Sequence, residues 1–470
     1  MDVVKQLLRV VAGPVLALAL PFTASAQGLI RDAEIETILR EYSDPLFEAA
    51  GLKPADVDIY IIQDDSLNAF VAAGQNVFIH TGLIMQSDTP EQLKGVIAHE
   101  TGHIAGGHNV TREQAMGAAQ GTSLITLGLG ALALFAGAPD AAMALFGSAG
   151  QFGMLTAFTF TRTEESAADQ YGLDFMEKTG QNPEGLLQFM EKFRYEELMS
   201  VARRDPYFRS HPISTDRIAN MRKRVAQIAV NSKPQDAHSL EQLAMMKAKL
   251  VGFIGPPSRV LSRYPASDQS IPAKYARTIA AYRAVDIKAA MTGIDELISL
   301  KPDDPYFHEL KGQILFESGK AAESVAPHRK SVELAPQHAL LKVNLARSLL
   351  GAKNAPGIKD EGLAEARIKE AEGLLIDAIA LEKDNAFAWN QLAAVYAAQG
   401  RTGDADFATA EEAYNVGDMG RAQVFAMRAV KKLDPATPNG QRASDIAALS
   451  DPRNRSGRGG RQPLALHTKH

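Results

Sequence analysis

The stretch GVIAHETGHIAGGH, residues 95–108, holds three histidines and one glutamate within a short span. It follows Thr89-Pro90-Glu91-Gln92, where a threonine cap, an early proline and an acidic residue predict the start of a helix. On that helix His99 and His103 lie four positions apart, and therefore on one face. The stretch thus predicts two side chains that can bind one ion together.

The residue types at these positions suit zinc chemistry. Neutral imidazole is a good zinc ligand. Glu100 follows His99 directly, so it projects beside the ion, where it can take a proton from a water that the metal activates. A catalytic zinc needs a third protein ligand. The motif alone therefore leaves open a histidine-rich helix that binds no metal.

Residues 162–172, RTEESAADQYG, supply candidates for the missing ligand. Glu165 and Asp169 lie four apart on this second predicted helix. Glu165 completes a set of two histidines and one glutamate, and Asp169 is placed to accept a hydrogen bond from a ligating imidazole. The alternative is an ordinary acidic helix start, since acidic residues are favourable there.

Composition bounds the class of protein. A chain of 470 residues with 46% hydrophobic and 22% charged residues predicts a globular protein of two or three domains. The formal net charge of −5 gives no reason to expect nucleic acid as a partner. Because the chain has no cysteine, a metal must be held by His, Asp or Glu.

The first residues predict export. Lys5 and Arg9 precede an apolar run over 10–20, and small residues follow at Ala24 and Ala26. This pattern is typical of a secretory signal peptide over residues 1–26, cleaved after Ala26. A membrane anchor is the alternative, but it needs about 20 apolar residues. We therefore expect a periplasmic protein.

Residues 27–230 are predicted to form the first domain. Helical spacing over 33–50 is followed by strand-like runs at 58–63, 68–72 and 76–80, which predict a small, mostly antiparallel sheet. Residues 121–158 carry no charge apart from Asp140 at a central break, and they predict an apolar helical hairpin. This hairpin is either buried or an apolar flap that contacts membrane or unfolded clients.

The rest of the chain is predicted to be helical and repetitive. Pro302 and Pro336 lie 34 positions apart, which is the tetratricopeptide period, and predict a repeat solenoid over 266–450. A generic helical bundle is the alternative. The concave face of such a solenoid usually binds protein. Residues 231–265 are expected to be a helical linker and 451–470 a disordered basic tail. The fold class is α+β, mainly α.

Four motifs together resemble the M48 family of zinc metallopeptidases, over roughly residues 30–225. They are the two helices described above, at 99–103 and 165–169, and the segments 68–70 and 210–218. The resemblance implies a zincin-like domain. It also implies one zinc ion per chain, with His99, His103 and Glu165 as ligands and Glu100 as general base.

The resemblance further implies a cleft beside the zinc. Asn68 and Arg217 are expected to line it, and His211 either occupies the fourth zinc position or donates a hydrogen bond to the oxyanion. An extended substrate is expected to add itself to a sheet edge formed by 68–70 or 77–79. The substrate-contacting residues predicted in this way are Asn68, Phe70, Val77 and Phe78.

Two histidines are expected to lie outside the metal set. His108 lies five positions after His103 and is interpreted as structural, and His80 is expected at the surface.

The signal peptide and the repeats resemble one periplasmic branch of the family. That branch implies an endopeptidase for misfolded or stalled outer-membrane proteins, with repeats that dock clients and the assembly machinery and add chaperone-like activity. A non-proteolytic assembly chaperone is the alternative. A membrane-embedded prenyl-protein type protease is a third reading, against which the lack of a 20-residue apolar span counts.

Overall fold

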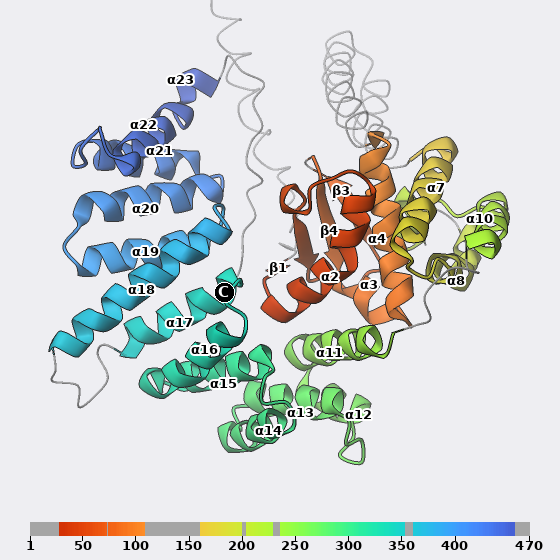
Figure 1. Cartoon of the computed structure of the whole chain (residues 1–470), viewed down its shortest axis with the longest axis horizontal. Coiled ribbons are helices and arrows are strands. Elements are labelled where there is room, and N and C mark those ends of the chain that lie inside the picture. The colour runs from red at the N-terminus through yellow and green to blue at the C-terminus, as the bar shows by residue number, and fades with distance from the viewer. Residues whose placement is uncertain are drawn as a thin grey trace, which may run out of the picture.

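The structure is a computed structural model that describes residues 28–72, 74–108, 160–199, 204–228, 236–352 and 361–455. An N-terminal α+β domain packs beside an arc of helix pairs (Figure 1). The expected signal peptide, the apolar hairpin over 121–158 and most of the basic tail lie outside the described residues. Within the described part, no helix is long and apolar enough to cross a membrane.

The N-terminal domain surrounds a four-stranded sheet with helices. Its strands are β1 (Leu29–Ile30), β2 (Ile59–Ile62), β3 (Ala69–Ala72) and β4 (Asn76–His80). Its helices are α2 (Ala33–Ala49), α3 (Thr81–Gln86), α4 (Pro90–Ala105), α7 (Arg162–Thr179), α8 (Glu184–Lys192), α9 (Pro206–Ser210) and α10 (Thr215–Ile228), with two 3-10 turns at Pro54–Asp56 and Arg194–Leu198.

The sheet has the order β1-β2-β4-β3 and is mixed. β3 and β4 form a hairpin around Gly74, which has a positive φ of 93° that favours glycine. This reversal makes β4 run parallel to β2, while β1 pairs antiparallel with β2. The predicted small sheet is confirmed, but its central pairing is parallel because β3 lies at the far edge instead of between β2 and β4.

Helix α4 forms the centre of the domain. The Thr89 side chain accepts a hydrogen bond from the Gln92 backbone N–H, so the predicted cap is confirmed. Leu93, Val96 and Ile97 are fully buried in one core with the sheet, α2 and α7. The helix is therefore packed against several elements of the domain, and the histidines of its last two turns are buried.

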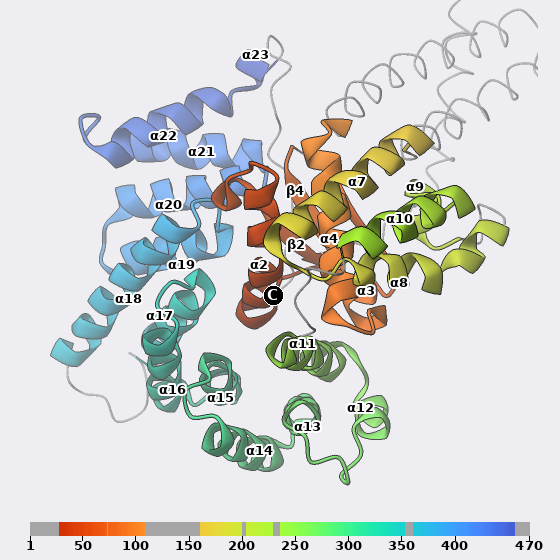
Figure 2. The same ribbon diagram turned by 45° about the vertical axis from the view of Figure 1, so that its right-hand side comes forward.

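Helix pairs from α13 onward form the repeats. They are α13 (Ile271–Arg283), α14 (Ile287–Leu300), α15 (Pro305–Glu317), α16 (Ala321–Leu334), α17 (Ala339–Ala352), α18 (Glu361–Leu381), α19 (Ala386–Ala398), α20 (Thr402–Asn415), α21 (Met419–Val430) and α22 (Pro438–Leu449), followed by the short α23 (Pro452–Arg455). The predicted 34-residue period corresponds to the pair α15–α16, which lies between Pro302 and Pro336. The arc curves around the N-terminal domain (Figure 2).

The expected linker over 231–265 contains α11 (Ala237–Ile254) and α12 (Pro257–Arg263), and α11 belongs to both domains. Its residues Leu243, Met246 and Leu250 are buried in the core of the N-terminal domain. Met245, on another face, is buried in the first core of the repeats. Because both faces are packed, α11 joins the two domains as a shared helix and not as a free connector.

Candidate metal centre

The two histidines of α4 point to one place in the interior. His99 Nε2 and His103 Nε2 lie 3.1 Å apart, and both side chains are fully buried. Their spacing of four residues places both rings on one helix face. Helix α4 therefore presents two imidazoles that face one point, as the sequence predicts.

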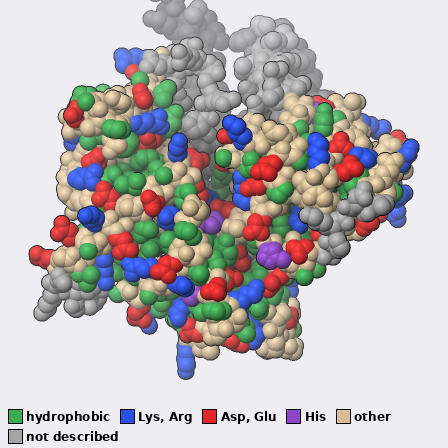
Figure 3. Space-filling model, in the orientation of Figure 1, with side chains coloured by type: hydrophobic (Ala, Val, Ile, Leu, Met, Phe, Trp, Pro, Cys, Tyr) green, Lys and Arg blue, Asp and Glu red, His purple; other side chains and the backbone are tan. Residues whose placement is uncertain are grey.

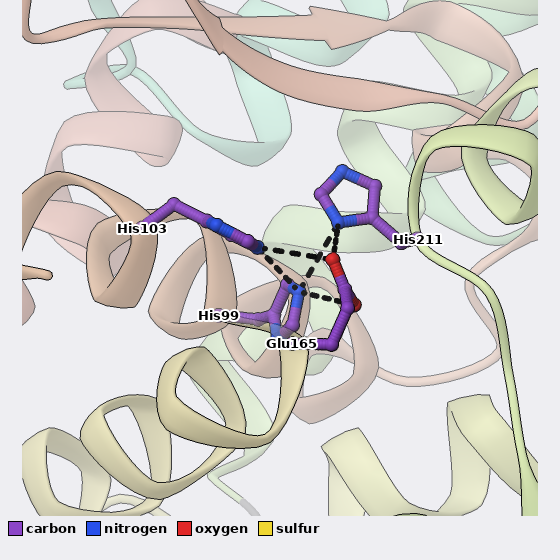
Figure 4. Close-up of side chains that lie close together, drawn as sticks. All are labelled: His99, His103, Glu165 and His211. Atoms are coloured by element: carbon purple, nitrogen blue, oxygen red, sulfur yellow. Dashed lines mark hydrogen bonds and ion pairs between the residues drawn. The ribbon is translucent and has the colours of Figure 1, made fainter. Parts of the chain in front are cut away.

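Glu165 comes from the first turn of α7 and faces both histidines (Figure 4). Its Oε1 lies 3.4 Å from His103 Nε2, and its Oε2 lies 3.5 Å from His99 Nε2. Burial alone would raise the pKa of Glu165, but the charges of His211 and Arg217 hold it well below its usual value. The carboxylate is therefore anionic, as a metal ligand must be.

Two glycines allow α4 and α7 to come this close. A Cβ added at Gly102 would lie 2.5 Å from the carbonyl oxygen of Ala168. A Cβ at Gly172 would lie 3.0 Å from the backbone of Ala98. The two backbones therefore touch directly beside the ligands, which brings a carboxylate 66 positions away in the sequence into reach of His99.

His211 enters the cluster from the residue that follows α9. Its Nδ1 lies 2.9 Å from Glu165 Oε1 and 3.3 Å from His99 Nε2. Its ring stacks on Tyr207 at 4.6 Å between centroids and is fully buried. His211 thus faces the same point as the three predicted ligands, as Figure 4 shows.

The four side chains fit a zinc ion. Their candidate ligand atoms all lie within 4.8 Å of one another. Zinc–nitrogen bonds of about 2.0–2.1 Å in a tetrahedron separate the ligand atoms by about 3.3 Å, and the spacings given above lie on both sides of that value. Burial holds the pKa of His103 well below its usual value, so its imidazole is neutral and ready to ligate.

Asp169 fixes the orientation of His99. Its Oδ1 lies 2.9 Å from His99 Nδ1, so the opposite ring nitrogen faces the centre. Burial opposes the charged form of His99, but the hydrogen bonds to Asp169 and Glu165 outweigh it and raise its pKa to about 10. The acidic surroundings therefore favour a positive charge at this place, as a metal ion would supply.

Arg217 binds the carboxylates of both Asp169 and Glu165. Its Nε and Nη2 donate to the two carboxylate oxygens of Asp169 at 2.8 Å, and its Nη1 lies 2.7 Å from Glu165 Oε2. The side chain is only 4% exposed. The sequence places Arg217 in the substrate cleft, whereas here its guanidinium is committed to the two carboxylates and the Pro212 carbonyl, and it acts as a positioning residue.

Glu100 and His108 each lie next to one histidine of the cluster. Glu100 Oε1 is 3.5 Å from His211 Nε2, beside the point on which the ligands converge. His108 Nδ1 is 3.0 Å from His103 Nδ1, so it orients a ligand ring in the way that Asp169 does. The sequence interpretation of His108 as structural missed this contact. Its signal is Gly107, whose positive φ of 67° turns the chain back toward the helix.

The predicted substrate residues divide into two groups. Asn68 and Phe70 are half-buried on or next to β3, which is an edge strand of the described sheet. Val77 is fully buried and Phe78 is 4% exposed, and their strand β4 is flanked by β2 and β3. A central strand has no free edge, so 77–79 is not the sheet edge that the sequence analysis expected, and 68–70 lies on the edge strand.

His80 is also not at the surface. It is 3% exposed, and its Nδ1 lies 3.0 Å from Ser66 Oγ.

Comparison with known proteins places the first domain in a family. Residues 30–225 match the model of peptidase family M48. This part of the chain is an M48 peptidase domain. The expected family is confirmed, and with the buried His and Glu ligand set the domain is a zinc metallopeptidase.

Curated relatives extend the similarity beyond this domain. The chain is 24% identical over 342 residues to "Beta-barrel assembly-enhancing protease" of Yersinia pestis, covering 70% of this chain and 68% of the relative. It is 25% identical over 331 residues to the Escherichia coli (strain K12) protein of the same name, covering 68% and 66%. "Metalloprotease YcaL" of the same strain is 30% identical over 184 residues, covering 37% and 63%. The chain thus spans about two thirds of the length of these relatives.

Proposed function

We propose that this M48 protein is a zinc endopeptidase of the bacterial periplasm that acts on outer-membrane proteins and is held closed by His211. The observation that carries the proposal is the convergence of His99, His103 and Glu165 on one buried point, with Glu100 beside it. Such a set suits hydrolysis of a peptide bond, because it combines three ligands with a carboxylate base.

Each residue has a distinct task in this reaction. Zinc, when bound, polarises the scissile carbonyl and lowers the pKa of water. Glu100 accepts the proton of the attacking water and returns it to the leaving amine. Asp169 holds His99 in one tautomer, and Arg217 keeps Asp169 and Glu165 in position while balancing their charge.

The closed state rests on the place of His211. Its Nδ1 faces the three ligands and its Nε2 faces Glu100, and none of these side chains is more than 1% exposed. A substrate carbonyl cannot reach the centre until the segment that carries His211 moves. This supports a blocking role for His211 in the closed enzyme, and a hydrogen bond to the oxyanion becomes available to it after opening.

The compartment and the clients rest on the relatives. Two of them are named for enhancing β-barrel assembly, and their similarity extends over more residues than the peptidase domain contains. Together with the predicted signal peptide over residues 1–26, this supports a periplasmic location. Stalled or misfolded outer-membrane proteins are the proposed clients, and the repeats are proposed to dock them and the assembly machinery. Peripheral membrane contact through 121–158 remains part of the proposal.

Glu100→Gln tests the chemistry directly. The variant keeps the three ligands, so we expect it to retain about one zinc ion per chain and to lose casein cleavage by about 10²-fold or more. Metal analysis and a fluorescent casein assay, with and without chelator, measure both. Undiminished cleavage by the pure variant would overturn the mechanism. Full rescue by this variant of cells that lack the protein would instead favour a non-proteolytic chaperone.

His211→Ala tests the closed state. Removing the imidazole opens the fourth position, so we expect casein cleavage to rise, whereas His238→Ala, at an exposed histidine, leaves it unchanged. A loss as large as that of Glu100→Gln would contradict the blocking role and assign His211 to the oxyanion.

A further inference from the structure

A second hollow lies between the two domains, away from the zinc ligands. Its volume is about 720 Å³, which is in the range of ligand-binding cavities. One wall is the edge strand β1 with the ends of β2 and β4, and the other is formed by α15, α17 and α19. Figure 1 shows β1 on the side of the sheet that faces the repeats.

Arg347, on α17, stands in this cavity between two aromatic rings. Its guanidinium carbon lies 5.0 Å from the centroid of Phe316 and 5.3 Å from that of Phe387, one from each neighbouring repeat. Contacts of this kind attract a cation and also restrict the orientation of the planar group. Arg347 is half-buried and lines the cavity.

The other cations that line the cavity are already neutralised. Arg31 lies 2.8 Å from Glu36 and 2.8 Å from Glu382. Lys249 lies 2.8 Å and 3.1 Å from two carboxylates at the start of α2. By contrast, no carboxylate of the described ranges lies within ion-pair distance of Arg347. Arg347 is therefore the cavity-lining cation that has no carboxylate partner within the described ranges.

The acidic residue with an electrostatic effect on Arg347 is engaged elsewhere. Glu317 accepts hydrogen bonds from the Tyr282 hydroxyl and from Gln313 Nε2. Burial lowers the pKa of Arg347, and Glu317 only partly offsets this, so the cation lacks a full counter-charge. An anion that reaches it gains a desolvated, preorientated partner.

The shape and charge of the cavity indicate which anion fits. A guanidinium fork binds a planar carboxylate with two parallel hydrogen bonds. Glu317, Asp58 and Asp384 also line the cavity, and they would repel a ligand with several negative charges. Gln313 and Asn344 line the repeat side, where their side-chain amides donate to Glu317 and Glu309. The edge of β1 lies opposite, so its backbone is available to pair with an extended peptide.

Acidic and basic side chains are interspersed over the face of both domains seen in Figure 3, so that face offers no extended basic patch. A face of this kind does not attract a polyanion over a long range. Attraction of an anion is instead local, at the guanidinium of Arg347.

We propose that Arg347 and its two phenylalanines bind a carboxylate of an extended polypeptide in the cavity between the repeats and the peptidase sheet. The site deepens the docking role proposed for the repeats but does not depend on zinc chemistry. The carboxylate belongs either to the C-terminus of the bound chain or to an Asp or Glu side chain, and both sources share the same chemistry at Arg347.

The test uses the full-length Glu100→Gln protein, which leaves the probes intact. A dansyl-labelled hexapeptide of alternating apolar and polar residues without acidic side chains is made with a free or an amidated C-terminus, because the dansyl label carries no carboxylate. A third peptide is amidated and carries one internal glutamate. Fluorescence anisotropy measures the dissociation constant of each. Arg347→Gln removes the charge, Arg347→Lys keeps the charge without the fork, and Arg401→Gln is the matched control.

Arg401 suits the control because it also stacks on an aromatic ring of the repeats, at 4.2 Å from the Tyr396 centroid, but is paired with Glu372 and Asp404. We expect a peptide with a carboxylate to bind at least tenfold more tightly than the neutral peptide. Arg347→Gln should abolish this preference, Arg347→Lys should retain part of it, and Arg401→Gln should leave it intact.

The three peptides separate the two sources of the carboxylate. A preference for the free C-terminus alone assigns the site to chain ends, and equal binding of the internal-glutamate peptide assigns it to side chains. Equal binding of all three peptides by the parent protein, no binding of any, or a preference that survives in Arg347→Gln overturns the proposal. The test measures peptide binding and neither zinc content nor casein cleavage. Its outcome is therefore independent of whether the proposed peptidase mechanism is correct.

Discussion

Lys249 is the residue whose loss should most weaken the joint between the two domains. It lies on the shared helix α11, is 2% exposed, and contacts Asp32 Oδ2 at 2.8 Å and Glu34 Oε2 at 3.1 Å. Glu34 also accepts a hydrogen bond from the Tyr275 hydroxyl of α13 at 2.9 Å. One buried cation therefore balances two carboxylates at the start of α2, where the peptidase domain meets the repeats.

The expected cost of Lys249→Met follows from this burial. Removing one partner of a buried ion pair leaves uncompensated charge and costs about 3–5 kcal/mol. The matched control is Lys301→Met, whose ammonium lies 2.7 Å from Glu241 but is 37% exposed. A surface pair of this kind contributes about 0–1 kcal/mol. The two variants remove the same charge and differ in burial.

Urea denaturation, followed by far-UV circular dichroism and by fluorescence of Trp389, the single tryptophan, measures the difference. Asp32→Asn and Glu34→Gln added to Lys249→Met should recover most of the lost stability, because the orphaned carboxylates are then neutral and asparagine still caps α2. If Lys249→Met costs no more than Lys301→Met, or the triple variant recovers nothing, the reasoning fails.

Three further predictions concern the same packing and the site. Burial raises the pKa of Glu34 from 4.5 to about 7, so its contribution to folding is lost as pH rises from about 4.5 through 7. At about 1.4 kcal/mol per pKa unit this amounts to about 3 kcal/mol, and the melting temperature of Glu34→Gln should fall less between pH 5 and pH 8 than that of the parent; parallel curves would contradict this. Gly102→Ala should cost about 1–3 kcal/mol and weaken zinc retention, because its Cβ meets α7 backbone at 2.5 Å. Gly373→Ala, with no atom within 4 Å of its Cβ on an exposed helix position, should instead stabilise by about 1 kcal/mol in the same thermal scans; equal effects would refute the close-packing argument. Asp169→Asn should lower zinc affinity about 10–100-fold, since the hydrogen bond that orients His99 changes character; competition with a chromogenic chelator measures it, and an unchanged affinity would remove Asp169 from that role.

Local periodicity was enough to predict several parts of the site. His99 and His103 share a face because an α-helix has 3.6 residues per turn, and the Thr89 cap marks where that helix begins. The 34-residue spacing of Pro302 and Pro336 likewise identified one helix pair of the repeats. These features depend on residues a few turns apart, so the sequence contains them in readable form.

Strand order and burial were not readable in this way. The runs at 68–72 and 76–80 look alike in sequence, yet β3 is an edge strand and β4 is central. Pairing partners are decided by the whole sheet and not by either strand, so the sequence could not tell which of the two runs forms the sheet edge. The same holds for His80, whose burial depends on elements packed around it.

What the sequence by itself determined is the chemistry: two imidazoles, a base and a distant carboxylate of the types that zinc hydrolysis requires. Only the tertiary structure decided how they meet. Glu165 reaches His99 because Gly102 lets α4 and α7 touch, and Arg217 lies behind the ligands because its guanidinium is the counter-charge of two buried carboxylates. His211 closes the centre, and α11 joins both cores, through contacts between segments far apart in the chain. Such contacts follow from packing and buried charge, which no local pattern encodes.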